Sequence, residues 1–117
     1  MATNSQIAFN PQGETVVVAA DAVAPAGVQA PVYPRAQPQE TGQVRVVNAS
    51  NNLVHLGYGP TAAIAQANAV AALAGNPAPS VPVVAGTVEI LRFPAGSFFS
   101  GIAGAASTIY LTPGEGL

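Results

Sequence analysis

Short apolar runs separated by glycine and proline fill the last third of the chain. They are rich in Val, Ile, Phe, Tyr and Thr, and runs of this composition between Gly or Pro residues are typical of β-strands. Because the runs follow one another at short spacing, they favour antiparallel pairing in a sandwich or barrel over a parallel sheet with long crossovers. The strands predicted here cover residues 81–85, 88–93, 98–103 and 108–112.

Alternation of apolar and polar positions predicts a β-hairpin in the middle of the chain. Residues 43–48 (QVRVVN) and 53–58 (LVHLGY) each place a set of apolar side chains on one face, and residues 48–52 (NASNN) between them are typical of a turn. Residues 14–20 predict an earlier strand that is apolar on both faces. The apolar members of the alternating patterns form the predicted core, which contains Val44, Val46, Val54, Leu56, Ile109 and Leu111.

A proline-rich segment, residues 21–42, separates the first strand from the predicted hairpin. Pro25, Pro31, Pro34 and Pro38 interrupt any strand ladder there, because proline lacks an N–H donor and fixes φ. We interpret the segment as a Pro-rich arm or long loop. Two alternatives stay open: the segment reaches a neighbouring subunit, or it wraps around its own domain.

An Ala- and Pro-rich insert, residues 60–80, precedes the last third of the chain. Alanine favours helix over residues 61–75, Pro60 and Thr61 are suited to its start, and Gly75 is suited to its end. The pattern has no strong apolar anchors, so an isolated helix would be marginal. The sequence therefore leaves open one short Ala-rich helix or an extended loop.

Composition points to a protein that buries surface against other subunits. The length predicts a single domain over residues 1–117. Only 7% of the residues are charged, against roughly 25% in an average soluble domain. Neutral polar side chains could keep such a surface hydrated, but the excess of Ala, Val and Pro favours burial in a homo-oligomer, a dimer or trimer.

Charge and cysteine content exclude several classes of partner and site. Three cationic residues in 117 are too few for the Lys/Arg footprint of nucleic-acid binding. The absence of cysteine excludes disulfides and Cys-based metal sites. Residues 1–4 lack the basic and apolar regions of a secretory signal. Glycine, proline and serine interrupt the uncharged run 93–114 too often for a transmembrane helix, so no membrane association is expected.

The residues that commonly carry chemistry do not form a recognisable motif. His55 is the only histidine, and no carboxylate has a ligand-like spacing to it. A Ser–His–Asp triad would have to use His55 and Asp21, but no nucleophile-elbow signature is present. We therefore predict no catalytic residue, no metal ligand and no cofactor, and a protein that is not an enzyme. The carboxylates are scattered over Glu14, Asp21, Glu40, Glu89 and Glu115.

Glu89 and Arg92 pose a question about the strand that contains them. They lie three residues apart, so ideal alternation places them on opposite faces. If Glu89 faces outward, Arg92 shares a face with apolar neighbours, and a charge there needs a partner or a route to solvent. A bulge near Pro94 or an ion pair between subunits would each resolve this, and the sequence does not choose.

Three stretches resemble the small β-sandwich structural proteins of tailed bacteriophage virions. A strand beginning V-R-V-x-N, a strand P-V-x-x-G-T-x-E followed by a P-x-G turn, and a closing T-P-G-E-G-L are the shared features. The matches are concentrated in the second half of the chain, whereas the Pro-rich arm has no counterpart and the Ala-rich insert is longer than expected. The three matching stretches are VRVVNASNNLVHLGYG at 44–59, VPVVAGTVEILRFPAG at 81–96 and IYLTPGEGL at 109–117.

The resemblance implies a fold, a role and a location. The fold would be an all-β, jelly-roll-like antiparallel sandwich, and the role would be that of a capsid decoration or cement protein without an active site. Such a protein is made in the host cytoplasm and binds the major capsid protein on the outside of the virion, where it stabilises the shell. The alternative is another virion component (a head–tail joining, tail or fibre protein) or a small ligand- or carbohydrate-binding β-module. Carbohydrate binding would need Tyr33, Tyr58 or Tyr110 exposed in a groove.

Overall fold

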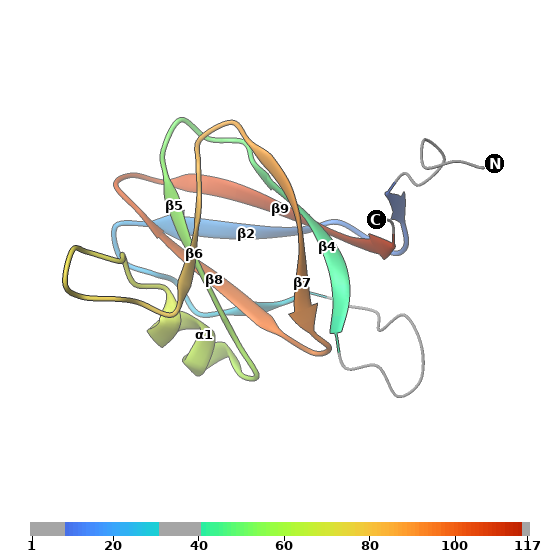
Figure 1. The fold of residues 1–117 in the computed structure, drawn as a ribbon, viewed down its shortest axis with the longest axis horizontal. Coiled ribbons are helices and arrows are strands. Elements are labelled where there is room, and N and C mark those ends of the chain that lie inside the picture. The colour runs from blue at the N-terminus through green and yellow to red at the C-terminus, as the bar shows by residue number, and fades with distance from the viewer. Residues whose placement is uncertain (1–8, 31–40, 116–117) are drawn as a thin grey trace.

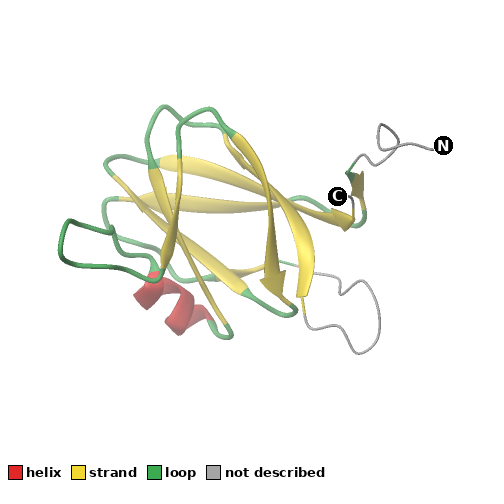
Figure 2. Ribbon diagram, in the orientation of Figure 1, coloured by secondary structure: helices red, strands yellow, loops and turns green. Residues whose placement is uncertain are grey.

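The computed structural model describes residues 9–30 and 41–115, and its strands form one curled sheet (Figures 1 and 2). Seven strands follow one another across this sheet in the order β6-β5-β8-β2-β9-β4-β7, while β1 pairs with β9 and β3 pairs with β8. One short helix, α1, completes the fold, so the all-β prediction is confirmed. The strands are β1 (Asn10–Pro11), β2 (Val16–Asp21), β3 (Val28–Gln29), β4 (Thr41–Asn48), β5 (Val54–Gly59), β6 (Ser80–Val83), β7 (Val88–Pro94), β8 (Phe98–Ala103) and β9 (Ser107–Glu115).

The two edge strands of the sheet, β6 and β7, belong to one two-stranded ribbon that is bent in the middle. β4 pairs with β7 in one half of the ribbon, and β5 pairs with β6 in the other half. The chain passes from β4 to β5 through residues 49–53 and from β6 to β7 through residues 84–87, so both bends lie at the same end (Figure 1). The predicted hairpin of residues 43–48 and 53–58 is therefore wrong. Both stretches are strands, but β4 and β5 pair with other strands and not with each other.

The last two long strands lie beside the ribbon and enclose β2. β8 pairs with β5, β9 pairs with β4, and β2 lies between β8 and β9. The β2–β8 pair is parallel, whereas all the other strand pairs are antiparallel. The sheet is thus mixed and continuous, which differs from the wholly antiparallel arrangement that the sequence predicts. Two separate stacked sheets, as in the predicted jelly-roll-like sandwich, are not evident in the strand pairing.

The core lies inside the curl and consists of the predicted residues and a few more. All six predicted core residues have no exposed surface. Phe99 and Phe93 join them, with their ring centroids 4.8 Å apart in an edge-to-face arrangement. Burying an aliphatic side chain of this kind stabilises the fold by roughly 1.5–3 kcal/mol, so the alternating pattern carries much of the fold's stability.

The Ala-rich insert forms a helix over only part of its length. α1 spans Ala62–Asn68, and Thr61 is its N-cap, accepting a hydrogen bond from the Ile64 amide at 3.2 Å. Thr61 is thus at the predicted helix start, but the helix ends at Asn68 and not near Gly75. Gly75 instead has φ of +79° in the extended connection that follows, within a turn joined by hydrogen bonds between Leu73 and Asn76. Each of the two alternatives left open by the sequence is therefore correct for a different part of the insert: a short helix comes first, and an extended loop follows it.

The first half of the Pro-rich arm lies against its own domain. The Ser100 hydroxyl donates to the Pro25 carbonyl at 2.6 Å, and the Gln66 amide donates to the Ala24 carbonyl at 2.7 Å. The Ala30 amide donates to the Ser97 carbonyl at 3.2 Å. Residues 22–30 thus wrap around their own domain. Residues 31–40 lie outside the described residues, so the predicted contact of the arm with a neighbour stays a prediction.

Candidate assembly surfaces

His55 lies on the outer face of β5, beside a shallow, mainly apolar pocket of about 540 Å³. We call this the end pocket. The Nδ1 atom of His55 is buried and has no hydrogen-bond partner among the described residues. Asp21 and His55 both align with Ile102 of β8, so one strand separates them in the sheet. The residues that line the end pocket are Ala22, Asn52, Leu53, His55, Ala71, Ile102, Ala103 and Gly104.

The scattered carboxylates do not gather around His55. One carboxylate oxygen of Asp21 accepts a hydrogen bond from the amide of the next residue, Ala22, at 2.7 Å. Within residues 9–30 and 41–115, no group of three or more His, Asp or Glu side chains lies close enough together to hold a metal ion. Glu40 lies outside the described residues. The end pocket is thus a surface that could accept an apolar side chain, and it offers one imidazole.

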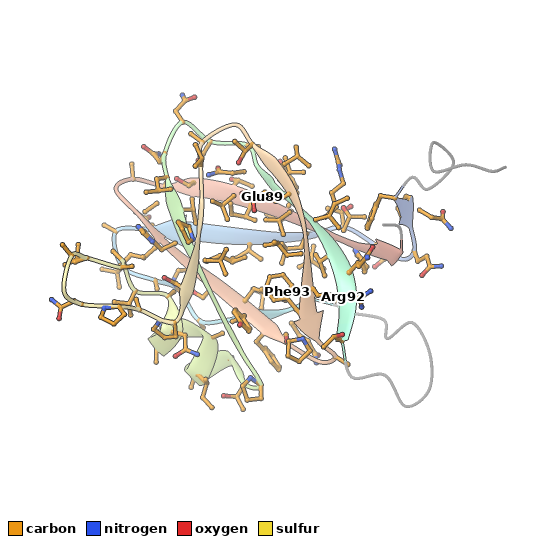
Figure 3. The ribbon with its side chains drawn as sticks, in the orientation of Figure 1. Glu89, Arg92 and Phe93 are labelled. Carbon is orange, nitrogen blue, oxygen red and sulfur yellow. The ribbon has the colours of Figure 1, made fainter. Side chains whose placement is uncertain are left out.

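Glu89 and Arg92 extend to opposite faces of β7, as ideal alternation requires. The register is regular from Val88 to Pro94, with Glu89 opposite the buried Val46 and Arg92 opposite Gln43 on β4. Figure 3 shows Glu89 and Phe93 on one side of the strand and Arg92 on the other. Glu89 therefore faces inward, and Arg92 is the outward, exposed residue. A bulge near Pro94 is absent, because Thr41 and Pro94 stay in register.

The tyrosines do not share a groove. Tyr58 lies on the inner face of β5, where its ring packs against Phe93 with centroids 5.0 Å apart. Tyr110 lies on the outer face of β9 and is 38% exposed. Tyr33 lies outside the described residues. A stacking platform that combines Tyr58 and Tyr110 would need both rings on one surface, and they lie on opposite faces of the sheet.

The outer face of β2, β9, β4 and β7 carries a continuous row of apolar side chains. Val17 aligns with Tyr110, Tyr110 with Val47, and Val47 with Val88, so the row crosses all four strands. Val17 is 53% exposed and Val88 is 49% exposed. We call this outer surface the sheet face. Large contiguous apolar patches on folded proteins mark interaction sites, whereas single exposed apolar residues are ordinary.

Hydroxyls and arginines flank the apolar row on one side. Thr15 and Thr112 join their hydroxyls at 2.8 Å, and Thr112 aligns with Arg45, which is exposed. One step further along β7, Arg92 donates to the Thr41 hydroxyl at 3.4 Å. Tyrosine and arginine are enriched at protein interfaces, whereas Lys and Asp are depleted there. The sheet face has the composition of an interface core with a cationic rim.

Both edge strands carry proline, which makes addition of a further strand unfavourable. Pro82 lies within β6 and Pro94 ends β7. Proline cannot donate to a ladder, and inward-facing charges such as Glu89 are another means by which natural sheets blunt an edge. Association through a face is therefore more favourable here than association through an edge.

The composition predicts exposed apolar surface that other subunits cover, but it does not show where on the fold this surface lies. The alternation of residues 43–48 places Val47 outward, but it does not reveal that Tyr110 and Val88 lie beside it. That neighbourhood depends on which strands pair, which alternation within a strand does not encode. Within the described residues, no helix has the length and apolar character needed to cross a bilayer. Comparison with known proteins found no matching family model, no matching curated protein and no matching solved structure.

Proposed function

We propose that this protein is a non-enzymatic structural component of a virion, a decoration or cement protein that binds the outer surface of the capsid shell. The observation that carries the proposal is the sheet face, where apolar side chains of four strands lie together: Val17, Tyr110 and Val88 are exposed and Val47 is half-buried. A protein with so few charged residues would gain stability from covering such surface with other subunits. The resemblance of residues 44–59, 81–96 and 109–117 to phage structural proteins gives the class of assembly.

The end pocket is a second surface through which the protein could bind a neighbour, so it remains available when the sheet face is covered. Leu53, which is 46% exposed, lines the pocket together with small residues of β8 and its following turn. Small residues around an exposed leucine make a recess that an apolar side chain of the shell could enter. Few charges lie near it, so salt should weaken shell binding only slightly.

The direct test is to add the purified protein to capsids assembled without it. We expect saturable retention on sedimented capsids and a higher temperature of shell disassembly in calorimetry, with little change when salt is raised. Failure of the protein to co-sediment with such capsids at saturating concentration would exclude the proposal.

A matched pair of variants tests which surface binds the shell. Leu53→Gln should weaken retention about tenfold, the effect of losing ~1.4 kcal/mol of binding, because it places an amide in an apolar recess. Val84→Gln is the control, since Val84 is 56% exposed but lies in the turn between β6 and β7, outside both surfaces. Equal retention of the two variants would show that the end pocket is not the contact.

A further inference from the structure

We propose that residues 9–30 are a strand donor that two copies of this chain exchange, each filling the slot between β8 and β9 of the other. We call residues 9–30 the donor segment. The observation that carries the inference is the place of β2, which lies between β8 and β9 in the sheet. An exchanged dimer would keep every strand pair of the single chain. The inference goes beyond the proposed function and its test needs no capsid, so the two can fail separately.

The donor segment takes its partners from the later part of the chain. Among the described residues, β1 pairs with β9, β3 pairs with β8, and β2 pairs with both. Side-chain hydrogen bonds join the same parts, from Ser100 to the Pro25 carbonyl and from Gln66 to the Ala24 carbonyl. None of these contacts requires the donor segment and its slot to belong to one molecule.

The slot between β8 and β9 is shaped for an inserted strand. Residues 104–106 connect the two strands directly, yet β2 separates them. At Gly101 of β8, an added Cβ would lie 2.9 Å from the Cβ of Ala20, and at Gly114 of β9 it would meet the Asn10 carbonyl oxygen. Both glycines therefore make room for the donor segment. An empty slot would leave backbone groups of β8 and β9 without partners, so some copy of the donor segment has to fill it.

The ends of the linking residues give a reason for exchange. Residues 31–40, ten residues with three prolines, connect the donor segment to β4. The Ala30 amide donates to the Ser97 carbonyl at 3.2 Å, and Thr41 aligns with Pro94, so both ends lie at the turn between β7 and β8. A chain that fills its own slot must return to this turn, whereas a proline-rich composition favours extension. Extended at about 3.1 Å per residue, such a linker would span about 31 Å toward a second copy.

The linker also sets the concentration at which exchange occurs. Because the strand contacts are the same in both forms, the balance depends on how strongly the linker holds the donor segment near its own slot. A short flexible linker gives an effective concentration in about the millimolar range, and a linker that resists reversal gives a lower one. We therefore expect closed monomers at micromolar concentration. Exchanged dimers should form as the concentration approaches millimolar, or where copies are crowded on a common surface.

A cysteine pair across β2 and β9 reports the exchange, because the chain has no cysteine of its own. Ala19 and Thr108 lie opposite each other, where Cβ atoms about 4.5–5.5 Å apart permit a disulfide. The variants Ala19→Cys and Thr108→Cys are mixed, unfolded in urea and refolded together at a series of concentrations in a glutathione redox buffer. We expect a disulfide-linked heterodimer whose fraction rises with concentration, measured by non-reducing electrophoresis and intact mass.

Ala19→Cys mixed with Val84→Cys is the control, since Val84 is 56% exposed but lies between β6 and β7. It measures collisional cross-linking and should give several-fold less heterodimer. Val17→Cys with Tyr110→Cys is a second matched pair in the same ladder, and circular dichroism verifies that each variant folds.

The double variant Ala19→Cys/Thr108→Cys, refolded at low concentration, should form its disulfide within one chain. Absence of that bond would overturn the β2–β9 register and the proposal with it. Matched pairs that give no more heterodimer than the control at the highest soluble concentration would also overturn the proposal, and so would a heterodimer fraction that does not rise with concentration.

Discussion

Asn48 connects the two bends of the ribbon at the scale of a single residue. It is fully buried at the end of β4, and its side-chain amide donates to the carbonyls of Asn52 and Val83, each at 2.9 Å. Its oxygen accepts from the Ser50 amide at 3.0 Å and from the Ser50 hydroxyl at 2.7 Å. All four hydrogen-bonding positions of the amide are thus used. One side chain fixes the bend at residues 49–53 and ties it to the strand that enters the other bend.

Replacing Asn48 with Ala should destabilise the fold by about 2–4 kcal/mol, because one buried and several part-buried groups at the two bends lose their partner, and a buried group without a partner costs about 1–3 kcal/mol. Asn48→Asp keeps the shape but turns an oxygen toward two carbonyls, so it should also be destabilising. Urea unfolding followed by circular dichroism measures both changes.

The matched control for this prediction is Asn51→Ala. Asn51 lies in the same bend but is exposed, so the free energy of unfolding should change by no more than about 0.5 kcal/mol. Equal midpoints for the Asn48 and Asn51 variants would show that the buried amide contributes nothing to the bend.

At the scale of secondary-structure elements, the position of α1 depends on glycine in β5. A Cβ added to Gly57 would meet the Ala69 amide nitrogen, would lie 2.6 Å from the Ala69 Cα, and would lie 2.7 Å from the Ala65 carbonyl oxygen. These are backbone atoms of the helix and of its C-cap, so they cannot move without moving the helix. The sequence LVHLGY indicates a strand, but only the folded chain shows that the glycine makes room for α1.

Gly57→Ala should destabilise the protein by about 1–3 kcal/mol through overpacking between β5 and α1. Gly104→Ala is the control, because a Cβ at Gly104 would meet nothing within 4 Å. That variant should be neutral, or more stable by about 0.4–1 kcal/mol, since alanine restricts the unfolded chain. Thermal melts of both variants give the comparison, and similar losses in the two would contradict the close approach of α1.

The elements also show how far alternation in a sequence can predict a fold. It located β4 and β5 and placed Val44, Val46, Val54 and Leu56 in the core, because the period of a strand determines which side chains share a face. It did not give the partners of those strands. A bend and a hairpin turn both favour Asn and Ser, so residues 48–52 could not be distinguished from a tight turn. The sheet face was missed for the same reason, since Tyr110 and Val47 are adjacent only through the β4–β9 pairing.

At the scale of the whole molecule, polar side chains are used to connect segments of the fold. Asn52 donates to the Ser107 hydroxyl at 3.1 Å, and Asn68 donates to the Tyr58 carbonyl at 2.9 Å. His55 is the only histidine, and within the described part of the chain no metal-binding group surrounds it. The fold is therefore expected to form without a bound ion.

Removal of divalent metal ions should leave the melting temperature unchanged. The measurement is a calorimetric melt of the purified protein before and after dialysis against a chelator. A drop of several degrees, reversed by adding back one metal, would show that carboxylates or His55 form a site that this arrangement does not indicate.

The place of β2 in the sheet has a consequence for how the protein is made. Among the residues that the structure describes, β2 pairs only with β8 and β9, so it waits for partners that are synthesised much later. While the chain emerges from the ribosome, Val16, Val17 and Val18 remain without a sheet until residues 98–115 have been synthesised. Contacts this distant in sequence slow folding and prolong the exposure of apolar segments. Folding of this sheet is thus expected to wait until β9 has emerged, and a translating cell would have to shield β2 in the meantime.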